Sequence, residues 1–498
     1  MIDPQKIDGV AMTVFIAFFA LVTVLGFFAA RWKRGDLSQL HEWGLGGRQF
    51  GTLISWFLVG GDFYTAYTVI AVPALVYSVG AYGFFAMPYT IIVYPFVFAV
   101  MPKLWEVCKR KNHITAADYV QGEFGGKWLP AAIAVTGIVA TLPYIALQLV
   151  GMQVVIKGLG VDGEIPLMLA FAILAVYTYS SGLRAPAMIA FVKDIMIYIV
   201  VIVAVSVIPA KLGGYGALFH AADTFFAAKG GAAGVMLKPS QFTAYATLAL
   251  GSALAAFMYP HTMTGVLSSA SASTVRKNAI ALPAYTLLLG LIALLGYMAI
   301  AADVHVKSAS DVVMALLSRL FPSWFVGFSA AAIAISALVP AAIMSIGAAN
   351  LFTRNLYKPL IAPDVTPEKE ARNAKLFSLI VKFGALLFIV VLPTQFAIDL
   401  QLLGGVWILQ TFPAVVFSLY TRRLTSAGLL AGWFIGIVTG TALAISMGLK
   451  PVYPLQLGGA TYPVYIGVLA LAVNIVVSVI VSAIMPRTRA MTAAAAGR

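Results

Sequence analysis

The chain carries little charge for its length. Only 10% of its 498 residues are Asp, Glu, Lys or Arg, whereas 61% are hydrophobic. A soluble domain usually carries about 25% charged residues. The composition therefore excludes a soluble globular protein and indicates a polytopic membrane protein. We expect a single membrane domain over 1–498, with a short basic cytoplasmic tail at 486–498.

Residues for catalysis and metal binding are also scarce. The single cysteine, Cys108, excludes a disulfide framework and a cysteine-based metal site. Five scattered histidines supply neither a metal cluster nor a nucleophile with its base, so we expect no enzyme activity and no cofactor. No long apolar run contains Glu. A proton-pumping respiratory subunit would carry Lys and Glu at the centres of several helices, so this class is disfavoured.

Long apolar runs make up most of the chain instead. A helix needs about 20 apolar residues to cross a bilayer, and about thirteen runs meet this length, so we expect an all-α protein that spans the lipid bilayer many times. The runs are 9–31, 51–78, 82–102, 128–157, 165–182, 186–210, 241–268, 278–301, 324–353, 376–395, 397–420, 425–447 and 463–485.

The positive charges predict how the chain crosses the membrane. When the loops are assigned alternately from an external N-terminus, the cytoplasmic loops hold a roughly threefold excess of Lys and Arg. This bias predicts an external N-terminus and a cytoplasmic C-terminus. It also explains the net charge of +14 without a nucleic-acid partner.

Two apolar runs contain helix breakers. In 51–78, Gly60 and Gly61 precede Asp62, with Pro73 downstream. Glycine costs about 1 kcal/mol and proline about 3 kcal/mol relative to alanine inside a helix. The run is therefore either a packing kink or a discontinuous helix whose free carbonyls bind a cation; Asp62 favours the second interpretation.

The second interrupted run, 244–269, contains Pro260 and His261. Interrupted segments in corresponding positions of two halves are typical of transporters. The spacing fits a five-plus-five inverted repeat, with the first repeat at 51–210 and the second at 241–420. One extra helix precedes the repeats and two follow them.

Polar residues beside these breaks are the candidates for solute binding. Asp62 could ligate a cation, carry a coupling proton or stabilise the kink. The other candidates beside the breaks are Thr65, Tyr67, Thr68, Tyr259 and His261, and the fourth apolar run adds Tyr144 and Gln148. For the threonines the ordinary alternative is a hydrogen bond back to the helix, and for His261 it is a structural role.

The stretch "FVKDIMIYIVVIVAV" places Lys193 and Asp194 at the edge of an apolar run. Consecutive residues on a helix do not face each other, so we expect no ion pair between them. Either Lys193 extends its side chain to cytoplasmic water, or the pair takes part in transport. Lys382, two turns inside its own run, is expected to be an interfacial anchor.

The motifs "LHEWGLGGRQFGT", "SSGLRAPAMIAFVKD", "ALVPAAIMSIGAANLFTRNLYKPL" and "LGGVWILQTFPAVVFSLYTRRLTSAGLLAG" resemble the signature regions of the sodium:solute symporter family. The resemblance extends from about residue 40 to about residue 450 and implies a LeuT-type inverted-repeat fold with alternating access. Within that family, "VGGDFYTAYTVIAVPALVYSVGAYG" and "FVKDIMIYIVV" are most similar to bacterial monocarboxylate permeases, which import lactate and pyruvate.

The resemblance also implies a sodium site. Two carbonyls of the broken helix, which fall on Gly61 and Tyr64, would face an alanine carbonyl and two hydroxyls in a pattern like A-x-x-S-[ST]. Ala342 and Ser345 match this pattern, but Ile346 replaces the second hydroxyl. Isoleucine cannot ligate sodium, a cation that requires oxygen ligands.

Lys193 stands where the family carries a threonine, next to the matching Asp194. An ammonium group can replace sodium, since it has the same charge and binds similar oxygen partners. The resemblance therefore implies a coupling-ion site of Gly61, Tyr64, Ala342, Ser345, Lys193, Asp194 and Asp62, with either H⁺ or Na⁺ as the coupling ion. Gln410 also matches a family position and either lines the cavity or locks helices together.

The residues and the resemblance together predict a cation-coupled symporter that imports small monocarboxylates, such as lactate or pyruvate, across a bacterial inner membrane, with protons favoured over sodium. The alternative is a sodium symporter for another small solute, such as an amino acid, pantothenate or acetate. The sequence leaves the identity of the solute, the stoichiometry and the oligomeric state open.

Overall fold

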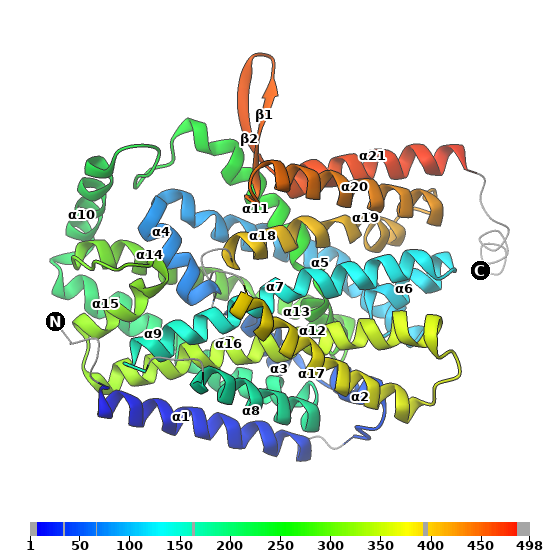
Figure 1. Cartoon of the computed structure of the whole chain (residues 1–498), viewed down its shortest axis with the longest axis horizontal. Coiled ribbons are helices and arrows are strands. Elements are labelled where there is room, and N and C mark those ends of the chain that lie inside the picture. Colours follow the sequence, from blue (N-terminus) through cyan, green and yellow to red (C-terminus); the bar gives the residue numbers. More distant parts are fainter. Residues whose placement is uncertain (1–6, 33–34, 66, 162–164, 392–396, 486–498) are drawn as a thin grey trace.

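Apolar helices make up most of the structure. Without water in the bilayer core, backbone amide and carbonyl groups must be paired inside the protein, and a helix pairs them within one segment. The computed structural model describes residues 7–32, 35–65, 67–161, 165–391 and 397–485. Most of the long helices lie roughly along the longest axis of the molecule (Figure 1).

The helices of the first half of the chain include both halves of the first interrupted run. They are α1 (Gly9–Phe28), α2 (Leu40–Leu45), α3 (Thr52–Phe63), the π-helix η3 (Tyr67–Ala71), α4 (Val72–Val79), η4 (Ala81–Phe85), α5 (Ala86–Arg110), α6 (Ala116–Phe124), α7 (Trp128–Gly158), α8 (Ile165–Ser181), α9 (Arg184–Lys211) and α10 (Gly214–Lys229).

The second half contains the other interrupted run and a β-hairpin. Its elements are α11 (Phe242–Ala256), α12 (Pro260–Leu267), α13 (Ala272–Ala281), α14 (Pro283–Ala301), α15 (Val312–Leu320), α16 (Ser323–Leu351), the π-helix η7 (Phe352–Ile361), α17 (Pro367–Val391), α18 (Ala397–Ile408), η9 (Leu409–Thr411), α19 (Phe412–Val415), α20 (Ser426–Ser446), β1 (Val452–Leu457), β2 (Ala460–Tyr465) and α21 (Ile466–Ile484).

Within these described residues, nine helices are long and apolar enough to span a bilayer, or eleven when each of two bent pairs is taken as one span. Of the other predicted spans, α8 is shorter, with 17 residues, and the predicted span 376–395 ends at positions outside the described residues. The total of thirteen therefore stays a prediction.

The centre of the molecule is α16, which packs against α1, α7 and α9. Its residues are buried along almost its whole length, and many of them are Ala, Ser or Gly. Small side chains let membrane helices approach each other closely. A Cβ on Gly327 would clash with the backbone carbonyl of Ala11 on α1, so glycine is required at this helix crossing.

Both interrupted runs are bent. The two halves of the first run, Thr52–Phe63 and Thr68–Val79, meet at 49°, and those of the second, Pro239–Ala256 and Pro260–Leu267, meet at 51°. The second break lies where Pro260 predicted it, because proline fits the first turn of α12 but lacks the N–H that a continuous helix needs.

The first break lies further along the chain than the glycines predicted. Gly60 and Gly61 are inside α3, and the chain leaves the helix at Tyr64. The glycines serve close packing instead: a Cβ on Gly60 would overlap the ring of Tyr285. Pro73 does not break a helix either, since it lies in the first turn of α4.

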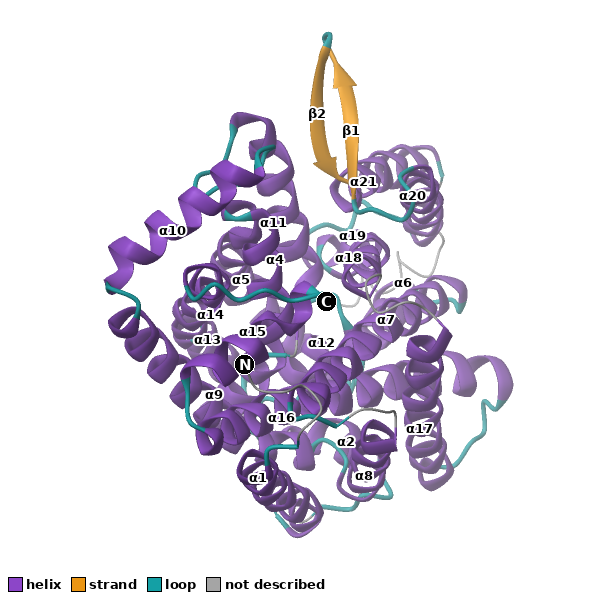
Figure 2. Ribbon diagram, turned by 60° about the vertical axis from the view of Figure 1, so that its left-hand side comes forward, coloured by secondary structure: helices purple, strands orange, loops and turns teal. Residues whose placement is uncertain are grey.

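The periphery suits contact with lipid. Large apolar side chains such as Val24 on α1, Phe434 on α20 and Ile480 on α21 are more than half exposed. The antiparallel hairpin of β1 and β2 projects away from the helical body in both views (Figures 1 and 2). It leads from the end of α20 back into α21.

Candidate functional site

The ammonium group of Lys193 lies at the first helix break. Its Nζ donates hydrogen bonds to the backbone carbonyls of Gly61, at 2.6 Å, and of Tyr64, at 2.9 Å. These are the two carbonyls that the family resemblance predicts for a bound cation. The Lys193 side chain is fully buried, so the ammonium does not extend toward water.

The end of α3 explains why these carbonyls are available. The last carbonyls of a helix have no intrahelical partner. The carbonyl of Phe63 accepts a hydrogen bond from the Thr68 hydroxyl, and that of Gly61 is bonded by Lys193. The helix break therefore leaves backbone carbonyls free to accept side-chain hydrogen bonds, and Lys193 of α9 bonds the one at Gly61.

Asp194 completes the charge balance at this site. Its Oδ1 lies 2.8 Å from Lys193 Nζ, and its Oδ2 accepts a hydrogen bond of 2.7 Å from the Tyr285 hydroxyl on α14. A buried charge without a partner costs several kcal/mol. The ammonium is therefore held by a carboxylate and two carbonyls, which is an oxygen environment suited to a monovalent cation.

The prediction that Lys193 and Asp194 do not pair is wrong. The rule for consecutive helical residues concerns short side chains that leave the helix about 100° apart. The long lysine stem reaches back toward α3, where a Cβ on Gly61 would meet both Lys193 and Asp194. The two groups thus converge on Gly61 rather than across their own helix.

The α16 residues of the predicted ion site are buried, and α16 packs against both α3 and α9. The Ser345 hydroxyl donates to the Ala342 carbonyl at 2.8 Å, a bond within α16 itself. Ile346 adds an apolar side chain beside them. Among the described contacts, Lys193 Nζ is bonded only by oxygens of Gly61, Tyr64 and Asp194.

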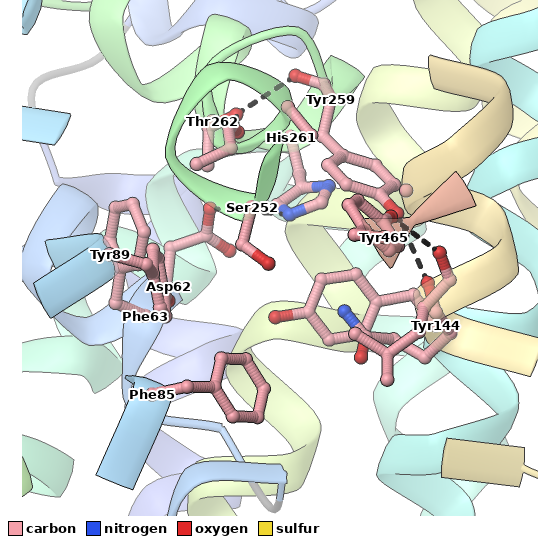
Figure 3. A pocket seen from close by; sticks show the side chains of 15 residues that line it. Asp62, Phe63, Phe85, Tyr89, Tyr144, Ser252, Tyr259, His261, Thr262 and Tyr465 are labelled. Carbon is pink, nitrogen blue, oxygen red and sulfur yellow. Dashed lines mark hydrogen bonds and ion pairs between the residues drawn. The ribbon is translucent and has the colours of Figure 1, made fainter. Parts of the chain in front are cut away.

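A small cavity lies beside both breaks, with a volume of about 50 Å³. On that measure one water molecule needs about 10–15 Å³, so the cavity suits a solute of only a few heavy atoms. Its polar lining includes Asp62, Tyr144, Ser252, Tyr259, His261 and Thr262 (Figure 3). Gln401 and Tyr465, which the sequence gave no reason to single out, also line it.

Asp62 lies in this cavity rather than among the contacts of Lys193. Its Oδ2 is 3.8 Å from Nε2 of His261, and the two side chains are 3% and 2% exposed. Neither carboxylate oxygen has a hydrogen-bond partner among the described residues, nor does Nδ1 of His261. The site residues thus divide into an ammonium site, where Lys193 contacts Gly61, Tyr64 and Asp194, and a polar cavity that Asp62 and His261 line.

Other predicted residues lie elsewhere. Thr68 bonds back to the Phe63 carbonyl, and Gln148 donates to the Tyr144 carbonyl at 3.3 Å. Thr65 is fully buried but is not part of the cavity lining. The side chain of Tyr67 lies outside the described part of the structure.

Gln410 joins helices instead of lining the cavity. Its amide donates to the Val406 carbonyl at 2.9 Å, and its side-chain oxygen accepts a bond of 3.1 Å from Asn474 on α21. The anchor prediction for Lys382 is wrong: its side chain is 1% exposed and its Nζ donates to the Ser378 carbonyl at 3.4 Å. α17 packs against α7, α8 and α16, so this face of the helix points inward.

Comparison with known proteins identifies the family. The sequence model of the sodium:solute symporter family matches residues 43–436, which is most of the chain. The chain belongs to the sodium:solute symporter family. The fold agrees, since a solved structure of a Na⁺-coupled sialic acid symporter in a substrate-bound outward-open state superimposes with a TM-score of 0.77, at 13% identity over 96% of this chain and 98% of that one.

Relatives of this symporter family member span nearly its full length. A protein of Rhizobium johnstonii (strain DSM 114642 / LMG 32736 / 3841) named "Monocarboxylate transport permease protein" is 64% identical over 96% of this chain and 98% of its own. The "Uncharacterized symporter YodF" of Bacillus subtilis (strain 168) is 35% identical over 86% and 88%. A "Sodium/proline symporter" of Staphylococcus aureus (strain JH9) is 24% identical over 96% and 94%.

The symporter also contains a charged network that sequence reasoning missed. Asp118 on α6 accepts from the Ile114 amide at 2.9 Å, from Asn355 at 2.8 Å and from Arg354 at 3.3 Å. Arg354 and Lys358 of η7 pair with Glu370 of α17, at 3.1 and 2.9 Å. These residues are far apart in the sequence and in predicted loops, so no local pattern connects them.

Proposed function

We propose that this protein is a proton-coupled symporter that imports small monocarboxylates, such as pyruvate or lactate, across the bacterial inner membrane. The observation that carries the proposal is the bonding of Lys193 Nζ to the carbonyls of Gly61 and Tyr64, the place that the family resemblance assigns to sodium. A tethered ammonium leaves no room there for a metal ion. Loss of its proton would change the charge of the site as loss of sodium does in a sodium symporter.

The solute class is supported by the cavity and by the relatives. The cavity volume suits a molecule the size of a short organic acid, and a relative with 64% identity is named as a monocarboxylate permease. Phe85, Gln401 and Tyr465 line the cavity beside loops that the charge bias assigns to the exterior. We take the N-terminus as external and the C-terminus as cytoplasmic.

Sodium symport of another small solute is the second candidate. In its favour, a relative with 24% identity is named as a sodium/proline symporter, and Ala342 and Ser345 keep two of the ligands that the family pattern requires. Against it, Ile346 contributes no oxygen, and Lys193 already holds the two carbonyls of α3.

Uptake of labelled pyruvate and L-lactate into proteoliposomes tests the proposal. We expect an inward proton gradient to drive accumulation, and replacement of sodium by choline to leave it unchanged. Lys193→Met leaves Asp194 buried without its cation, a change that costs about 3–5 kcal/mol for buried pairs. It should abolish gradient-driven accumulation.

Lys211→Met is the matched control, because Lys211 lies on the same helix but is exposed at its end. It should accumulate pyruvate like the unaltered protein. Full gradient-driven accumulation by Lys193→Met, or a strict sodium requirement of the unaltered protein, would overturn the proton-coupled mechanism. Competition by proline, pantothenate and acetate tests the solute class in the same assay.

A further inference from the structure

The cavity presents an electrostatic problem for a carboxylate solute. Among the described residues that line it, none is Lys or Arg, and Asp62 is the one acidic side chain. Two neighbouring carboxylates repel each other strongly in a buried site, where little water screens their charges. An anion therefore cannot bind next to an ionised Asp62 unless a positive charge enters with it.

His261 is the group that can supply this charge. Its Nε2 faces Asp62 Oδ2 at 3.8 Å, and its Nδ1 is buried without a partner among the described residues. A neutral imidazole donates from one nitrogen only, whereas imidazolium donates from both. Only the protonated ring can donate to an ionised Asp62 from one nitrogen and to a second acceptor from the other. Figure 3 shows the imidazole of His261 and the carboxylate of Asp62 in the same cavity.

Aromatic side chains pack around His261 and hold its imidazole ring beside Asp62. Tyr144 and Tyr259 lie edge-on or tilted against the imidazole, with centroids 5.3 and 5.2 Å away. Pro260 fixes the start of α12, so that His261 lies in the first helical turn beside the cavity. The ring is therefore held by packing, while its Nδ1 has no hydrogen-bond partner among the described residues.

We propose that the solute carboxylate binds His261 together with one proton, with Asp62 as the counter-ion on the opposite nitrogen. Binding adds one anion and one proton, so the net charge of the cavity is the same in the empty and loaded states. The proton comes from the external solution with the anion and leaves with it on the cytoplasmic side. This inference rests on the proposed function and assigns a second proton, separate from that of Lys193.

The titratable groups that face this pair are few. The other titratable groups in the described lining are the phenols of Tyr89, Tyr144, Tyr259 and Tyr465. Lys193 is bonded to Gly61, Tyr64 and Asp194 and does not line the cavity, but its positive charge also acts on Asp62. A proton taken up on binding can therefore be assigned to the Asp62–His261 pair or to Lys193.

Isothermal titration calorimetry on the purified protein measures this proton directly. Pyruvate is titrated in mildly alkaline buffers of different ionisation enthalpy, and the slope of the heat gives the protons taken up. By linkage, we expect about one proton per anion, with an affinity that falls as the pH rises. This measurement needs no variant, so misfolding cannot obscure it.

Three variants assign the proton. His261→Gln should remove the proton uptake and weaken pyruvate binding by about tenfold or more, as loss of a charge-assisted hydrogen bond does. Asp62→Asn should shift tight binding to lower pH. Lys193→Met should still take up one proton when pyruvate binds, even though it abolishes gradient-driven accumulation of pyruvate.

His220→Gln and Asp223→Asn, both exposed on α10, are the matched controls and should bind pyruvate like the unaltered protein. Pyruvate binding without proton uptake, or full proton uptake by His261→Gln, would overturn this inference and leave the proposed function intact. Loss of proton uptake in Lys193→Met would assign the proton to Lys193 and would also overturn this inference. Failure of both pyruvate and lactate to bind the unaltered protein would overturn the proposed function.

Discussion

Gly61 meets two requirements that no other residue can meet together. Its carbonyl accepts the Lys193 ammonium, and a Cβ at this position would lie 2.8 Å from Asp194 Oδ2 and 3.1 Å from Lys193 Nζ. Both contacts are shorter than ordinary packing allows, and neither group can withdraw, since Lys193 and Asp194 are buried and bonded to each other. Even one methyl group must displace the pair.

We therefore expect Gly61→Ala to lower proton-driven pyruvate uptake into proteoliposomes by roughly 100-fold, the effect of a displacement of about 1 Å at a catalytic group. Gly51→Ala is the control at the start of the same helix, where an added Cβ meets open space and φ is −69°. Gly51→Ala should transport normally. Unchanged uptake by Gly61→Ala would show that the position of Lys193 does not matter for coupling.

The sequence was sufficient to pair Lys193 with the carbonyls of Gly61 and Tyr64, because family resemblance places motifs from distant helices at one site. It could not separate Asp62 from that site. Successive side-chain directions on a helix are about 100° apart, so position 61 faces Lys193 and Asp194 of α9 while the side chain of Asp62 enters the cavity. Only the orientation of α3 decides this division.

At the scale of elements, composition predicted both breaks but misplaced one of them. Proline removes a hydrogen bond wherever it stands, so Pro260 marked the start of α12 correctly. Glycine only lowers helix stability, and close packing can compensate for that loss. Gly60 and Gly61 remain helical against Tyr285 and Asp194, and the break follows at Tyr64.

The Asp118 network joins α6, η7 and the region around the single cysteine. Asp118 holds the Ile114 amide, and the preceding His113 amide donates to the Cys108 carbonyl at 2.8 Å. Cys108 itself is fully buried. Movement of this segment during transport would expose a thiol that has no competitor in the chain.

We expect Asp118→Asn to speed maleimide labelling of Cys108 by roughly tenfold, since loss of about 1–3 kcal/mol of hydrogen bonding to a charged group raises the open population accordingly. Labelling is followed by mass spectrometry on the purified protein. Asp364→Asn, an exposed acid between η7 and α17, should label at the original slow rate. Equal rates in both variants would mean that Asp118 does not hold this segment closed.

At the scale of the whole molecule, the fold was predictable because its constraints are few. Apolar runs predict the helices, and the family match over residues 43–436 agrees with a helical symporter. The two repeats, which the breaks at corresponding positions predict, stay a prediction. The cavity was not predictable to the same degree. Tyr465 reaches it only because the hairpin of β1 and β2 returns the chain to the bundle, an arrangement without a periodic signal.

The two proton positions together predict how much charge crosses the membrane. Lys193 is paired with Asp194 and His261 with Asp62, so each proton position has its own counter-ion and the two protons need not replace one another. An anion that enters with two protons moves net positive charge inward. One proton alone would make the same uptake electroneutral.

We expect pyruvate jumps on solid-supported membranes to give inward positive currents that grow as the external solution is acidified and are the same in sodium and in choline. Each unit of charge moved costs or gains about 2.3 kcal/mol per 100 mV, so an inside-negative potential should raise pyruvate accumulation in proteoliposomes. His261→Gln, measured at saturating pyruvate and low external pH, should retain pyruvate uptake but lose most of the current, because one proton per anion moves no net charge. Pyruvate uptake that is insensitive to the membrane potential would restrict the cycle to a single proton. Whichever of His261→Gln and Lys193→Met then keeps proton-driven pyruvate uptake has lost the position that does not carry this proton.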